Sequence, residues 1–157
     1  MWQLTCTKSD RGRYKVIATQ SCSLIRVIPH AFEETLDMLR SALQREGLQI
    51  ICEVPFHREF RKSMGVTCVK YSVLVVWSQF ETWRAVLTED DAGLLMPFNI
   101  AIKEDGNSTM IAVNNWIGRC QACASVGVSL MVHDTEARMR RVFDACDPAN
   151  LPAEVKP

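Results

Sequence analysis

The sequence predicts an α+β fold in which helices pack on one face of a mostly antiparallel sheet. Two observations support this prediction. The segments with strand composition cluster together instead of alternating regularly with long helices, which is typical of antiparallel sheets. The two clearest helical patterns, at residues 32–46 and 135–145, each carry a single apolar stripe. A helix with one such stripe needs a sheet face to cover it.

The N-terminal half begins with an arm, then one strand and the longest helix. Residues 1–20 form the arm, in which residues 14–19 have the composition of a short strand. Residues 21–28 are rich in β-branched side chains and stop before Pro29, so they predict a strand. A helix follows, because apolar residues recur at i, i+4, i+7 and i+11, namely at Phe32, Leu36, Leu39 and Leu43. Gly47 is placed where a C-terminal cap is expected.

Three shorter elements are expected next. Residues 48–54 predict a strand that Pro55 closes. Residues 56–64 are basic and carry apolar side chains four residues apart, which predicts a short helix before Gly65. Residues 69–77 are β-rich and predict a further strand.

A second short helix and a hairpin follow. The spacing of Phe80, Trp83 and Leu87 predicts a helix over residues 79–88, and an acidic turn follows it at residues 89–93. Residues 94–102 predict a strand, which Pro97 would restrict to a sheet edge or a bulge. The Asp-Gly pair in residues 105–108 predicts a hairpin turn into a return strand at residues 109–113.

The last part of the chain ends in a helix. Residues 114–129 show no clear period and are interpreted as a loop. Residues 135–145 predict an amphipathic helix, with apolar side chains at Met139, Val142, Phe143 and Cys146. Residues 148–157 are rich in proline and are interpreted as a flexible tail. The expected organisation is therefore one domain over residues 21–147, between an arm and a tail.

Composition narrows the class of protein. The chain has 157 residues, 18 basic and 18 acidic side chains, and a net charge of zero, which disfavours nucleic acid as a partner. No apolar run is long enough to span a bilayer or to serve as a secretory signal, so we expect no membrane partner. The cysteines number seven, and without a signal we expect reduced, mostly buried thiols in the cytoplasm.

Several stretches, taken in order, resemble the DUF302 family, which is named only as a domain of unknown function. The matching segments are residues 32–36, 43–48, 59–66, 70–74 and, most tellingly, 93–100 before the hairpin. The resemblance covers about residues 21–147. It implies a fold of the order β-α-β-β-β-β-α, similar to the repeat of the TATA-binding protein, and it implies a homodimer. It implies no activity. Many members carry a cysteine where this chain has Phe98, so any chemistry of that cysteine is lost here.

One pair of residues has a spacing that suits thiol chemistry. Cys120 and Cys123 form a C-x-x-C, which can chelate a metal or shuttle between dithiol and disulfide. His133 and Cys146 are the only plausible further ligands downstream, and their spacing matches no common zinc module. We therefore expect no metal and no cofactor, and we keep a thiol-dependent redox or metal-binding protein as the alternative function.

The best candidate for a ligand-binding site is the place where Lys70, Trp77 and Asn99 would converge on central strands. A polar residue on an otherwise apolar strand needs a partner when it is buried. None of the histidines, His30, His57 and His133, lies in a nucleophile motif, and no phosphate-binding or dinucleotide-binding glycine motif is present. Catalytic residues therefore cannot be named.

Three functions follow from these observations. The leading one is a cytoplasmic, homodimeric, non-catalytic module that binds a small ligand or a protein partner. The alternative uses the Cys120/Cys123 pair in redox or metal chemistry. The third is an enzyme with a cleft between the sheet and the helices.

Overall fold

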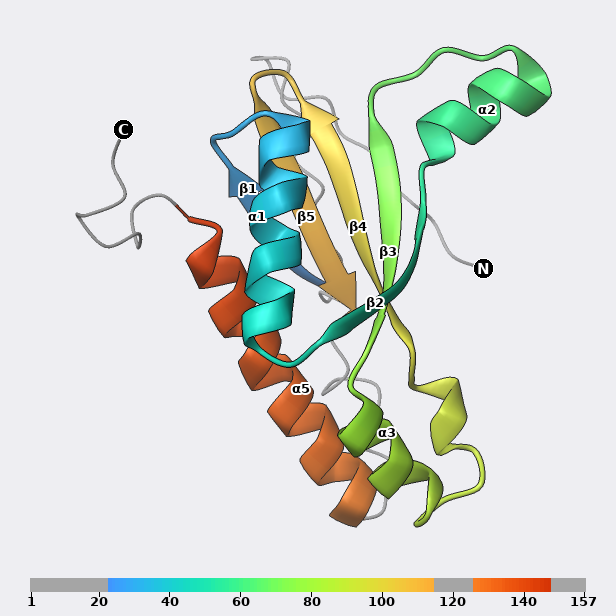
Figure 1. The fold of residues 1–157 in the computed structure, drawn as a ribbon, viewed down its shortest axis with the longest axis vertical. Coiled ribbons are helices and arrows are strands. Elements are labelled where there is room, and N and C mark those ends of the chain that lie inside the picture. The colour runs from blue at the N-terminus through green and yellow to red at the C-terminus, as the bar shows by residue number, and fades with distance from the viewer. Residues whose placement is uncertain (1–22, 115–125, 148–157) are drawn as a thin grey trace, which may run out of the picture.

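A computed structural model describes residues 23–114 and 126–147 of the chain. Figure 1 shows the arrangement of the elements. In chain order they are β1 (Ser23–Ile28), α1 (Phe32–Arg45), β2 (Gln49–Val54), α2 (Phe56–Met64), β3 (Tyr71–Trp77), α3 (Gln79–Val86), the 3-10 helix η1 (Ala92–Leu94), β4 (Phe98–Asp105), β5 (Ser108–Asn114) and α5 (Val126–Ala145).

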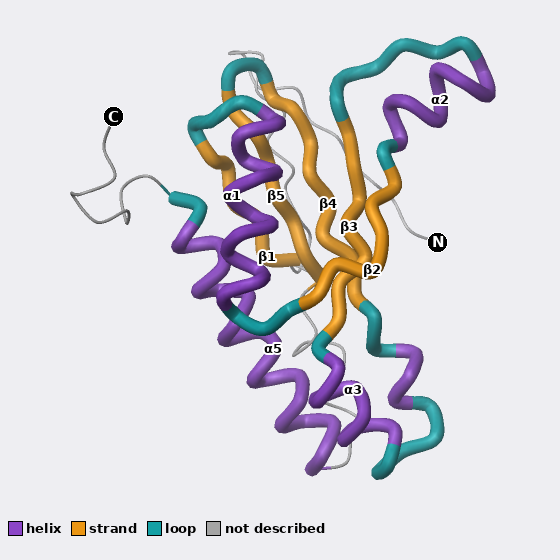
Figure 2. Tube along the Cα trace, viewed as in Figure 1, coloured by secondary structure: helices purple, strands orange, loops and turns teal. Residues whose placement is uncertain are grey.

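The strands form one antiparallel sheet of five strands in the order β1-β5-β4-β3-β2. The two long helices, α1 and α5, lie side by side on the same face of this sheet (Figure 1). The short helices α2 and α3 lie beyond opposite ends of the sheet (Figure 2). The long elements follow the order β-α-β-β-β-β-α, so the predicted α+β fold is confirmed.

Helix α1 forms where its apolar stripe predicts it. The stripe residues Phe32, Leu36, Leu39 and Leu43 are all buried. Gly47 adopts a φ of 68°, a left-handed conformation that favours glycine. The Leu48 amide then donates to the Leu43 carbonyl at 2.9 Å. This cap ends the helix and directs the chain into β2.

The core lies between the sheet and the two long helices. The strands contribute buried apolar side chains from every second position, among them Leu74, Val76, Ile100, Ile102 and Ile111. Helix α5 adds Met139, Val142 and Phe143. Two buried hydroxyls on the strands have hydrogen-bond partners: Thr109 donates to the His30 carbonyl at 2.9 Å, and Ser72 donates to Glu53 at 3.2 Å. Because both hydroxyls have partners, they do not disrupt the apolar layer.

Helix α5 begins nine residues earlier than the sequence predicts. The interpretation of residues 114–129 as a loop is wrong for residues 126–129, which form the first turn of α5. Gly127 weakens the helical signal there. In the structure this glycine allows α5 to approach α3 closely, because a Cβ atom on it would lie 3.0 Å from the Thr88 hydroxyl oxygen.

The predicted strand at residues 94–102 is also wrong at its start. Residues Ala92–Leu94 form η1, the Met96–Pro97 peptide is cis, and β4 begins at Phe98. Pro97 therefore precedes the strand and makes neither an edge nor a bulge in it. Strand β4 lies in the middle of the sheet, where it needs all its amide donors. The irregularity in the sheet falls in β2 instead, between Ile50 and Cys52.

Leu39→Ala will test the core. Leu39 is 0% exposed, so its truncation should lower the free energy of unfolding by about 2–5 kcal/mol. Gln44→Ala on the exposed side of α1 is the control and should change it by less than about 0.5 kcal/mol. Urea denaturation followed by far-UV circular dichroism measures both. Equal losses in the two variants would contradict the placement of α1.

Arg138→Met will test the contact between α3 and α5. Arg138 lies 3.6 Å from Glu81, whose side chain is only 9% exposed, so the variant leaves a buried carboxylate short of a partner. We expect a loss of about 1–3 kcal/mol in the free energy of unfolding. The matched variant Arg26→Met removes an exposed ion pair with Asp144 and should cost no more than about 1 kcal/mol.

Candidate functional site

The structure does not bring Lys70, Trp77 and Asn99 together. Lys70 precedes β3, whereas Trp77 ends it, so the two are separated by the length of the strand, roughly 20 Å. Trp77 and Asn99 do share one face of the sheet. Asn99 pairs with Val75 and is therefore a diagonal neighbour of Trp77, at about 7–8 Å.

Lys70 lies on the helix side of the sheet and has structural contacts. Its ammonium is 3.1 Å from a Glu33 carboxylate oxygen and 5.7 Å from the centre of the Phe32 ring. Its carbonyl accepts from the Glu104 amide at 2.9 Å, and its amide donates to the Glu104 carboxylate at 3.3 Å. Lys70 thus ties the start of α1 to β3 and β4. A ligand-binding role for it remains a prediction.

Trp77 and Asn99 belong to the sheet face that no described helix covers, which we call the open face. The strand register places five side chains in one row across it: Ile25, Ala112, Ala101, Val73 and Val54. The row is apolar from edge to edge, with its two smallest side chains beside each other in the centre. Val27 and Ile25 at the β1 edge are 57% and 37% exposed. Polar residues normally occupy a sheet face that meets water, so this face has the character of a binding surface.

Polar groups flank the apolar row on both sides. On one side the register aligns Met110, Lys103 and Tyr71. On the other side it aligns Asn99 with Val75 and Cys52. Among the described residues, Lys103 has no ion-pair partner. The open face therefore combines an apolar strip with an ammonium on one flank and a carboxamide on the other.

Sequence reasoning named Trp77 and Asn99, whose ligand-binding role stays a prediction, and did not name Lys103, Ala101 or Ala112. The available signal was the alternation in residues 98–113, where three of the positions between the core residues, Ala101, Met110 and Ala112, are apolar. That alternation does not show which strands are neighbours. Only the register reveals that Ala101 and Ala112 lie opposite each other.

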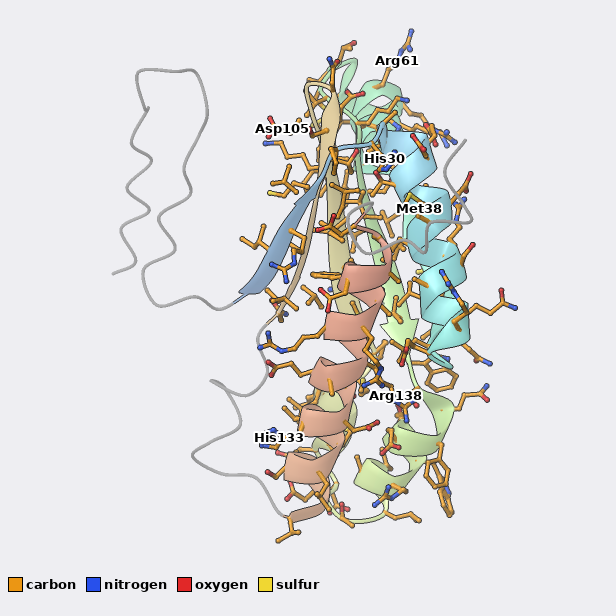
Figure 3. All side chains as sticks on the ribbon, turned by 90° about the vertical axis from the view of Figure 1, so that its left-hand side faces the viewer. His30, Met38, Arg61, Asp105, His133 and Arg138 are labelled. Atoms are coloured by element: carbon orange, nitrogen blue, oxygen red, sulfur yellow. The ribbon has the colours of Figure 1, made fainter. Side chains whose placement is uncertain are left out.

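The described histidines do not form a metal centre. The His30 ring is 2.8 Å from Glu34, and the His57 Nδ1 atom is 3.2 Å from the Tyr71 amide and 2.9 Å from its carbonyl. His133 is exposed on α5 and points away from the side that carries Arg138 toward α3 (Figure 3). Within residues 23–114 and 126–147, no group of three or more metal-binding side chains is found. Cys120 and Cys123 lie outside the described residues, so the alternative remains a prediction.

The third hypothesis puts a cleft between the sheet and the helices, and among the described residues the buried core side chains lie there. The described part of the chain also contains no helix long and apolar enough to cross a membrane.

Three cysteines are described, and their environments differ. Cys52 on β2 and Cys68 before β3 are exposed free thiols, so the expectation of buried thiols is wrong for these two. Cys146, just after α5, is buried as expected. Burial raises the pKa of the Cys146 thiol to about 11, against a smaller opposing effect of Arg45.

Comparisons with known proteins agree with this architecture. The family model described as "Domain of unknown function DUF302" matches residues 25–146. A crystal structure of the uncharacterized conserved protein DUF302 from Bacillus stearothermophilus is similar, with a TM-score of 0.72 and 15% sequence identity. The match covers 80% of this chain and 98% of that one. At this identity the likeness shows the fold. No curated protein matches the chain.

Alkylation of the native protein will test the cysteine environments. A thiol with a pKa of about 11 holds only about a thousandth of its population as thiolate at pH 8. Cys52 and Cys68 should therefore react with iodoacetamide within minutes at pH 8, while Cys146 reacts at least about 100-fold more slowly. Peptide mass spectrometry measures the alkylation rate of each cysteine. In urea, which unfolds the protein, the three rates should become equal. Rapid labelling of Cys146 in the folded protein would contradict its placement.

Proposed function

The chain belongs to the DUF302 family, and we propose that it is a homodimeric, non-catalytic module that binds a small ligand on the open face. The supporting observation is the apolar row that crosses the whole sheet, from Ile25 on β1 to Val54 on β2. The helices that bury the other face leave this one to a binding partner.

The chemistry of the open face favours an elongated apolar ligand with an anionic group. The central alanines, Ala101 and Ala112, leave the least side-chain volume in the middle of the row, where a flat hydrocarbon can lie closest to the backbone. Lys103 stands beside this centre and has no carboxylate partner among the described residues. An anion on the ligand would supply that partner.

Two further features support a non-catalytic role and a cytoplasmic location. The Nδ1 atoms of His30 and His57 are engaged in contacts that hold the fold, which favours a non-catalytic protein. The exposed free thiols Cys52 and Cys68 favour a reducing compartment, and hence the cytoplasm. The sequence also leaves a protein partner open as the occupant of the same face.

Decanoate is a suitable probe, because it has an alkyl chain and one carboxylate. Titration calorimetry should detect binding to the wild type. Ala101→Glu should weaken binding at least about 10-fold, because it places a carboxylate in the apolar row. Lys103→Glu should weaken decanoate binding about as much, but leave the binding of neutral decanol within about twofold of the wild type.

Lys62→Glu is the matched control, since Lys62 is exposed on α2 and belongs to none of the strands that form the open face. Circular dichroism of each variant checks that the fold is retained. If the wild type binds neither decanoate nor decanol, the small-ligand proposal fails and a protein partner becomes the occupant to test. If all variants bind decanoate equally, the open face is not the site.

A further inference from the structure

Helix α3 presents its apolar side to water. Phe80, Trp83 and Leu87 recur at i, i+3 and i+7, so they lie on one side of the helix. They are 60%, 60% and 67% exposed, and the neighbouring Val86 is 48% exposed. An amphipathic helix normally buries such a stripe, so this orientation needs a cause.

The cause is a buried carboxylate on the opposite side of α3. Glu81 is only 7% exposed, and it faces α5 together with the buried Ala85. Its two carboxylate oxygens lie 3.6 Å from Arg138 on α5 and 3.5 Å from Arg84. Turning the stripe inward would break the ion pair between Glu81 and Arg138, so this contact with α5 favours an outward apolar side of α3.

The exposed side chains also support one another. The rings of Phe80 and Trp83 have centroids 6.3 Å apart, and the Arg84 guanidinium lies 5.5 Å from the Phe80 ring centre. Side chains that are already ordered lose less conformational entropy when a partner binds. Leu94 in η1, which packs beside α3, is 86% exposed, and we include it in the surface. We call Phe80, Trp83, Val86, Leu87 and Leu94 the α3 surface.

The size of the α3 surface suits a two-fold interface. From the exposed fractions and ordinary side-chain areas, the five side chains offer roughly 600 Å² in one copy. Two copies packed together would bury roughly 1,200 Å², which is the lower end of the range for stable protein interfaces.

The charges around the α3 surface are self-complementary. Arg84 flanks the stripe, and the exposed carboxylates Asp90 and Asp91 follow the helix. An antiparallel pairing about Leu87 brings Arg84 of each copy toward this acidic turn of the other. The same acidic turn disfavours an anionic lipid surface, which attracts basic helices instead.

We propose that the α3 surface is the dimer interface: α3 packs antiparallel against α3 of a second copy, with Leu87 near the two-fold axis. This inference rests on the homodimer proposed above and assigns its interface. It leaves the open face of both copies to the ligand.

Sedimentation equilibrium of the full-length chain over a range of concentrations tests the inference. The wild type should dimerise, and Trp83→Glu and Leu87→Glu should each raise the dissociation constant of the dimer about 30-fold or more. Two controls carry the same charge on other exposed apolar positions: Leu130→Glu on α5 and Val27→Glu on the open face. Both should dimerise as the wild type does.

A charge-reversal pair gives a positive test. Arg84→Glu and the double variant Asp90→Lys/Asp91→Lys should each dimerise more weakly than the wild type, because like charges then meet across the axis. An equimolar mixture of the two should regain dimers, since both contacts in the mixed pair join opposite charges. Native mass spectrometry distinguishes the mixed dimer from either parent.

These experiments distinguish a failure of the proposed homodimer from a failure of the α3 surface as its interface. A wild type that stays monomeric at every concentration overturns the homodimer, and this inference with it. A stable dimer that Val27→Glu disrupts and Trp83→Glu does not overturns only the assignment to α3. A monomer that binds anionic phosphatidylserine vesicles through Trp83 would identify the α3 surface as a lipid contact and overturn the proposal.

Discussion

The structure depends on one packing constraint: the five-stranded sheet carries apolar side chains on both faces, but its long helices cover only one of them (Figure 1). Side chains such as Leu74, Ile100 and Ile111 meet the stripes of α1 and α5 on the inner face, and this contact is the main hydrophobic core. Every other feature of the fold is placed relative to that layer. The opposite face carries the row from Ile25 to Val54. The strands that supply the core also supply this row, because alternate residues along each strand point to opposite faces.

Polar interactions fix how the helices are positioned against the sheet and against one another, which hydrophobic packing alone does not determine. Glu53 accepts from the buried Ser72 and pairs with Arg40 of α1 at 2.7 Å, which joins β2 and β3 to the helix layer. Glu81 does the same for α3, since its pairing with Arg138 sets the rotation of that short helix against α5. Lys70 ties the start of α1 to the sheet through Glu33. These contacts make Lys70 part of the framework of the fold, and its ligand-binding role stays a prediction.

The two uncovered apolar surfaces have different characters, and this difference separates their proposed roles. The open face is broad and has an ammonium beside its centre, which suits a ligand that brings its own negative charge. The α3 surface is compact and is built on one short helix, with Arg84 on its flank and the acidic residues Asp90 and Asp91 after its end. Self-complementary charge favours a second copy of the same chain. A neighbour with 15% sequence identity and the same fold shows that this architecture tolerates extensive change in sequence.

The fold class, the order of the long elements and the glycine caps of α1 and α2 could be predicted from the sequence, because periodicity and glycine placement are local properties. The sequence also named Trp77 and Asn99 as candidate ligand-binding residues; the two share a sheet face, and their role stays a prediction. Tertiary structure alone decided the register that brings Ala101 beside Ala112, the central position of β4 and the early start of α5. It also decided that the stripe of α3 faces outward. Periodicity shows that a helix has an apolar side, but whether that side is buried depends on which distant residue, here Arg138, competes for the other side.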